Sequence, residues 1–101
     1  MVNKPRRMDE VKAKKELQKL RTKIDRADRN IVRELHKRWK VAGKLKALKK
    51  RYGIKIVEDA RIKEMKQKHV TSAKKYYVPE KVVDKVFTVI VKESLKFQKG
   101  K

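Results

Sequence analysis

Residues 20–50 read LRTKIDRADRNIVRELHKRWKVAGKLKALKK, and this stretch decides the fold. Its apolar positions recur at steps of three, four and seven, which is the period of one face of an α-helix. The pattern begins near Asp9 and ends at Tyr52, where cations in the last turn and the following Gly53 are typical of a helix end. The sequence therefore predicts one very long first helix with a single apolar stripe: Leu17, Leu20, Ile24, Ala27, Ile31, Leu35, Ala42 and Leu45.

Two shorter helices are predicted after this one. Residues 54–57 alternate like a strand, but we interpret them as a loop because no partner strand is evident. A second helix is expected from Glu58 or Asp59 to about Ser72, and a third begins with Pro79 at its first position. Their apolar faces comprise Ile62, Met65 and Val70 in the second helix, and Val83, Val86, Phe87, Ile90, Ser94, Phe97 and Gln98 in the third. The predicted fold class is all-α.

The composition limits the classes of function. A length of 101 residues predicts one domain, and 33 Lys and Arg against 12 Asp and Glu give a formal charge of +21. Such a charge favours nucleic acid, an acidic membrane or a small anionic metabolite as partner. Cysteine is absent, which excludes disulfides and thiolate metal sites. We expect a cytoplasmic protein, without a membrane span or signal peptide, and the Lys-rich composition is typical of a thermophile.

The length of the first helix indicates an assembly. A helix of about 36 residues spans roughly 54 Å, whereas a compact domain of about 100 residues has a radius of gyration of only about 13 Å. The long helix is therefore expected to extend beyond the other two and to leave part of its apolar stripe uncovered. We expect a homodimer of intertwined helices, in which the long helices pair.

Three cations fall on or beside this apolar stripe. With Ile24 at zero and about 100° per residue, Arg38 and Lys49 lie within about 40° of it and Arg21 at about 60°. Two interpretations remain open: each cation pairs with an acidic residue or extends to the surface, or together they enclose an anion. Ser94 and Gln98 would add neutral hydrogen-bonding groups to such a pocket. Other cations of the helix are interpreted as solvated surface: Lys37, Lys40, Lys44 and Lys46.

The spacing of these cations distinguishes two positions from the third. Arg38 and Lys49 are about 16 Å apart along the axis, so their long side chains can hold one small molecule from two ends. Arg21 lies about 42 Å from Lys49 and cannot reach the same molecule within one subunit. In an antiparallel dimer it can enter the pocket of the partner, which predicts two composite sites per dimer.

The sequence resembles the all-helical class of chorismate mutases, type II. The resemblance covers roughly residues 14–99 as one helical domain, with 1–13 as a basic N-terminal tail or helix extension and 100–101 as a C-terminal tail. It rests on the segments IKIVEDARIKEM (54–65) and VFTVIVKESLKFQ (86–98) and, in the first helix, on Leu20, Arg21, Ile24, Asp25, Asp28, Ile31, Leu35 and Arg38, followed by Lys49.

This resemblance implies roles for five residues. Arg21 corresponds to an arginine that reaches into the partner's site and binds one substrate carboxylate, and Arg38 corresponds to the arginine on the other carboxylate. Lys49 corresponds to a lysine that contacts a carboxylate and the ether oxygen of the substrate. Gln98 corresponds to a glutamine on that oxygen, and Ser94 to a hydroxyl near a carboxylate.

At the start of the second helix the sequence departs from the family. Arg61 matches the family's arginine, and Glu58 stands where Asp is common, beside the substrate hydroxyl. The position after Arg61, where the family normally has a Glu that hydrogen-bonds this hydroxyl, is Ile62. The related isochorismate-pyruvate lyases tolerate an aliphatic residue there, so Ile62 leaves the identity of the substrate open.

The implied activity is the rearrangement of chorismate to prephenate in phenylalanine and tyrosine biosynthesis, by an isomerase that needs no metal, cofactor or nucleophile. An isochorismate-pyruvate lyase on the same fold is one alternative. A basic helical nucleic-acid-binding protein is an alternative of another class, which the charge favours but which no helix-turn-helix, zinc-finger or RNA-binding motif supports. Docking to another enzyme of the shikimate pathway stays open.

Overall fold

The computed structural model of the chain describes residues 7–100. Within that range it contains three α-helices, α1 (Arg7–Tyr52), α2 (Asp59–Lys75) and α3 (Glu80–Lys99), and no strand. The prediction of an all-helical chain with one very long helix is confirmed, as is the loop at residues 54–57.

The chain divides into two units, residues 1–37 and residues 38–101, with the boundary inside α1. Of the first unit, residues 7–37 are helical throughout. Their apolar stripe is open to solvent, with exposed fractions of 46% at Leu17 and 60% at Ile24. Large exposed apolar stripes on a helix mark surfaces that bind another protein or membrane.

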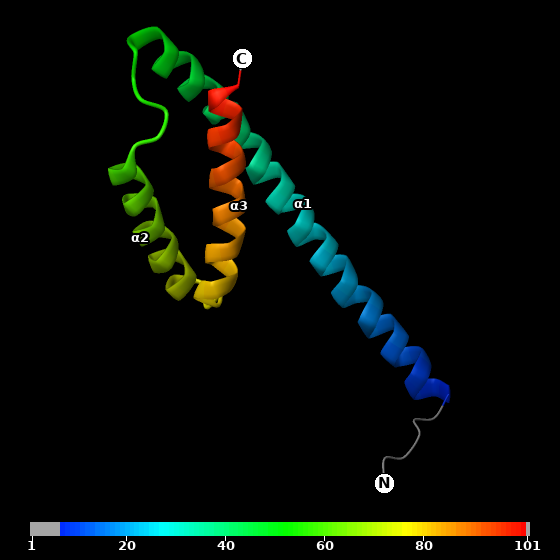
Figure 1. Ribbon diagram of the computed structural model, residues 1–101. Helices are drawn as coiled ribbons and strands as arrows, with labels where there is room; N and C mark the ends of the chain where they lie inside the picture. The colour runs from blue at the N-terminus through cyan, green and yellow to red at the C-terminus, as the bar shows by residue number, and fades with distance from the viewer. Residues whose placement is uncertain (1–6, 101) are drawn as a thin grey trace. The chain divides into compact units, whose positions relative to one another are not determined.

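In the second unit, α2 and α3 pack against each other as an antiparallel pair (Figure 1). The end of α1 joins them through side chains: the Trp39 and Phe97 rings stack with their centroids 5.1 Å apart. Among residues 7–100 the buried ones are Ala42, Ala73, Ser94 and Gln98, so half of this small core is polar.

The prediction that Lys46 belongs to the solvated surface is wrong. Lys46 is half-buried, and its ammonium lies 5.0 Å from the centre of the Phe97 ring, whereas Lys37, Lys40 and Lys44 are exposed as expected. The aromatic ring attracts the cation, and the aliphatic stem of the lysine covers apolar surface at the same time.

Helix α3 differs from its prediction at two positions. Pro79 precedes the helix instead of opening it, and its carbonyl accepts the Val82 and Val83 N–H groups at 3.0 and 3.2 Å. Val86, expected on the apolar side, is 48% exposed because it lies at the edge of the stripe that runs through Phe87 and Ser94.

Candidate functional site

A cavity of about 210 Å³ lies between the C-terminal part of α1, α2 and α3. Its wall is mixed, with cations and polar groups set among aliphatic side chains. Every site residue predicted within residues 38–101 lines it, namely Arg38, Lys49, Glu58, Arg61, Ser94 and Gln98, together with Ile62. Arg21 belongs to the other unit, and its place in a site stays a prediction.

Lys49 joins α1 to α3 across one side of this cavity. Its ammonium donates to Gln98 Oε1 at 2.9 Å and to the backbone carbonyl of Ile56 at 2.8 Å. The amide oxygen of Gln98 therefore accepts from Lys49, and its Nε2 donates to Ser94 Oγ at 3.5 Å. Gln98 and Ser94 are 6% and 5% exposed, so these bonds offset the cost of burying two polar side chains.

Arg38 is half-buried on the cavity wall. Burial lowers its pKa, and the positive charge of Arg61 lowers it further. Among residues 7–100, no acidic side chain forms an ion pair with Arg38 or Lys49. Internal ion pairing of these two cations is therefore not found within that range, and an anion site stays a prediction. An arginine remains charged at any physiological pH, so the cavity keeps this positive charge.

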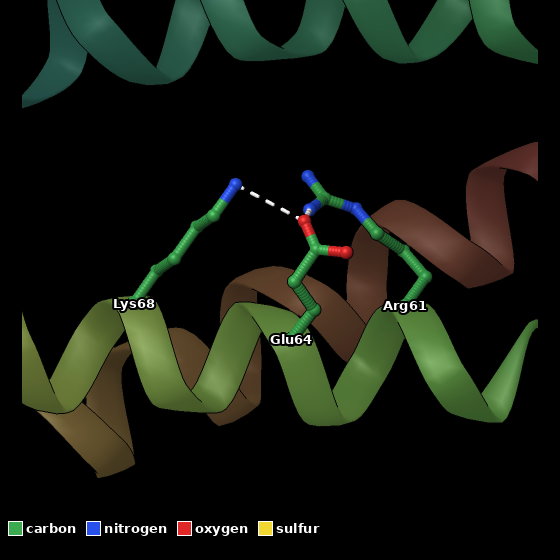
Figure 2. A network of polar contacts seen from close by, with 3 residues as sticks. All are labelled: Arg61, Glu64 and Lys68. Carbon is green, nitrogen blue, oxygen red and sulfur yellow. Dashed lines mark hydrogen bonds and ion pairs between the residues drawn. The ribbon is translucent and has the colours of Figure 1, made fainter.

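Arg61 takes part in a small network on α2 (Figure 2). Its Nη1 donates to Glu64 Oε1 at 2.8 Å, and Lys68 Nζ lies 3.0 Å from the same oxygen. Lys68, by hydrogen bonding and by charge, and then Arg61 lower the pKa of Glu64. All three side chains are more than half exposed, so this network orients Arg61 and adds little to stability.

The N-terminal end of α2 supplies the acidic and the apolar parts of the wall. Glu58 is the N-cap of α2, yet its side chain makes no capping bond; only its carbonyl accepts, from the Ile62 N–H at 3.1 Å. The Glu58 carboxylate is exposed and remains available to a ligand. Ile62 contributes aliphatic surface at the position where the resemblance expects Glu.

The sequence reasoning missed one feature of the site and one feature beside it. The Ile56 carbonyl was missed because a backbone acceptor carries no residue-type signal. His69 was given no role, but its ring stacks on that of Phe87 with the two centroids 3.7 Å apart. Both rings line a neighbouring cavity of about 340 Å³ between α2 and α3. The apolar spacing of Met65, His69 and Ala73 on one face of α2 was the available signal.

Within residues 7–100, no group of three or more His, Cys, Asp or Glu side chains is placed to hold a metal ion. None of the helices described there combines the length and apolar character needed to cross a bilayer.

Within residues 7–100 the fold is all-helical, and three cationic side chains line one cavity: Arg38, Lys49 and Arg61. Residues 20–99 match the family model for chorismate mutase type II, and the chain belongs to that family. Neither the curated proteins nor the solved structures yield a match to the chain.

The position of His69 predicts a pH dependence of stability. Burial lowers its pKa from the ordinary 6.5, and Arg38 and Arg61 lower it further. Because the folded state then binds the proton more weakly than the unfolded chain, stability is fully present above pH 6.5 and falls as the pH drops below it. Urea unfolding at about pH 7.5 and about pH 5.5 should show a smaller loss in His69→Gln than in the wild type.

The control for this experiment is His36→Gln, because His36 is an exposed histidine of α1. Asp84 and Lys66 line the cavity beside His69, and both remain in each variant. Equal pH dependence in His69→Gln and in the wild type would contradict the prediction.

Proposed function

We propose that this protein is a chorismate mutase, an isomerase that rearranges chorismate to prephenate in the biosynthesis of phenylalanine and tyrosine. Membership of the type II family supports this activity. The observation that carries it is the hydrogen bond from the Lys49 ammonium to the Gln98 amide oxygen, at the wall of a cavity that Arg38 also lines.

The reaction asks the protein for positioning and charge stabilisation. One carbon–oxygen bond breaks while one carbon–carbon bond forms within a single molecule, and no proton is transferred. The protein has to hold a dianion in its compact conformer and to stabilise negative charge that develops on the ether oxygen. Lys49 has three N–H donors, of which two are used by Gln98 and Ile56, so one remains for that oxygen. The Nε2 group of Gln98 is the second donor.

The carboxylates of the substrate are bound by the remaining groups. Arg38 and Ser94 bind one carboxylate, and Arg21 of the partner subunit binds the other. Arg61 adds positive charge from α2, and Glu58 accepts a hydrogen bond from the substrate hydroxyl. Three cations against one carboxylate in the cavity wall suit a dianionic ligand.

The protein acts as a homodimer in this proposal. The exposed stripe of residues 17–31 supplies an apolar surface for a second copy, which would cover side chains that are now half exposed. Arg21 lies within the same segment of α1 and enters the site of the partner, so each dimer has two composite sites.

Lys49→Ala should lower kcat by about 100- to 1000-fold, with a much smaller rise in KM. The reason is that the ammonium acts mainly on charge that is present only in the transition state. Steady-state rates of prephenate formation measure both constants. Lys50→Ala, which removes an exposed neighbouring lysine, is the control and should retain both constants. An equal change in kcat and KM in Lys49→Ala would contradict this role.

Mixing two inactive variants tests the composite site. Arg21→Ala and Lys49→Ala should each be nearly inactive as homodimers. Unfolding and refolding them together in equal amounts should restore about a quarter of the wild-type activity, because half of the dimers are mixed and each mixed dimer has one intact site. No recovery, with mixed dimers shown by native mass spectrometry, would contradict the contribution of the partner's Arg21.

Ile62 favours one second candidate, an isochorismate-pyruvate lyase on the same scaffold. Purified protein incubated separately with chorismate and with isochorismate distinguishes the two activities through prephenate or pyruvate. For the mutase, Ile62→Glu should raise kcat/KM by about tenfold or more, because a buried acceptor for the substrate hydroxyl is restored. Ile62→Gln, similar in size but uncharged, is the matched control. If Ile62→Glu instead lowers or leaves unchanged the kcat/KM for chorismate, the result would favour the lyase.

A further inference from the structure

The segment that joins α1 to α2 hydrogen-bonds both the backbone carbonyl and the side-chain ammonium of Lys49. The Ile54 N–H donates to the Lys49 backbone carbonyl at 2.8 Å, and the Lys49 ammonium donates to the Ile56 carbonyl at 2.8 Å. Two residues that are only two apart in the chain therefore bond to the backbone of Lys49 and to the end of its side chain.

Gly53 makes this arrangement possible. Its φ of 65° lies in the left-handed region, which turns the chain back over the last turn of α1. A Cβ built on Gly53 would have no heavy atom within 4 Å, so the position is open and the restriction concerns the backbone conformation alone. A residue that tolerates positive φ should keep the turn, and a β-branched residue should lose it.

The two acceptors set the direction in which Lys49 points. A free lysine side chain carries about 2 kcal/mol of rotamer entropy, so one hydrogen bond leaves its ammonium poorly directed. With Gln98 Oε1 and the Ile56 carbonyl both occupied, the third N–H has one remaining direction.

We propose that the Ile56 backbone carbonyl, held by the Gly53 turn, is a positioning group that aims the Lys49 ammonium at the ligand in the cavity. The kinetic consequence of this inference rests on the proposed function. The hydrogen bond from the Lys49 ammonium to the Ile56 carbonyl, which we call the clamp, is a property of the loop. It differs from simple helix capping, because a cap alone stabilises α1 and leaves the direction of the Lys49 side chain unchanged.

The first experiment compares two substitutions at Gly53. Gly53→Val should lower kcat by about 10- to 100-fold with little change in KM, whereas Gly53→Asn should stay within about threefold of the wild type, because Asn tolerates positive φ. Gly43→Ala is the control: its added Cβ meets only Phe97, at 3.9 Å, which is ordinary contact, and kcat should be unchanged. Equal kcat in Gly53→Val and Gly53→Asn, with both folded by circular dichroism, would overturn the proposal.

The second experiment needs no activity. The ¹³C chemical shift of the Ile56 carbonyl should move upfield in Lys49→Met, which removes the donor, and should not move in Lys50→Met, the exposed neighbour. An unchanged Ile56 shift in Lys49→Met overturns the clamp, including when Gly53→Val does not fold. If the wild type converts no chorismate but the Ile56 shift responds to Lys49→Met, the proposed function fails and the clamp stands.

Discussion

The hydrogen bond between the Lys49 ammonium and the Gln98 amide is the constraint on which the second unit depends. It links α1 to α3 at a point where a helical domain of this size would ordinarily place aliphatic side chains. Among residues 7–100, the two buried apolar residues are alanines, and the two buried polar residues, Ser94 and Gln98, line the cavity. Burying Gln98 costs free energy that is recovered only when its amide oxygen is bonded, so folding of this unit favours a Lys49 side chain that lies along the cavity wall.

The same arrangement concentrates positive charge. Arg38 and Arg61 are close enough for the charge of one to lower the pKa of the other, and the single carboxylate that offsets Arg61 lies on the exposed side of α2. In a chain of formal charge +21, repulsion of this kind opposes folding. A dianion bound in the cavity would relieve it, so ligand binding and stability are coupled through these arginines.

The sequence predicted the three helices and the place of Arg38 and Lys49 at the cavity wall, for physical reasons. Arg38 and Lys49 stand out because cations rarely fall within an apolar stripe, and a period of 3.6 residues places side chains reliably along one helix. The approach between helices is not periodic in the sequence, which explains why the interaction of Lys46 with Phe97 and the exposure of Val86 were predicted wrongly. The Ile56 carbonyl depends on the backbone path of a loop, and only Gly53 indicated a turn there. The role of Arg21 and the dimer remain predictions from the stripe and the helix length.

Ile62 affects two properties of the cavity wall, its net charge and the number of its hydrogen-bond acceptors. With Ile62, the wall holds three cations and the one carboxylate of Glu58, and a glutamate at this position would remove a further positive charge from that sum. The substitution therefore strengthens the general attraction for a dianion and removes one acceptor for a hydroxyl. Glu58 makes no capping bond with its side chain, so its carboxylate is free to be the remaining acceptor. If the ligand carries a hydroxyl, as proposed, its recognition depends on this exposed side chain, where water competes for the same hydrogen bond. For the proposed mutase we therefore expect weaker discrimination between ligands by hydroxyl position than with a glutamate at residue 62.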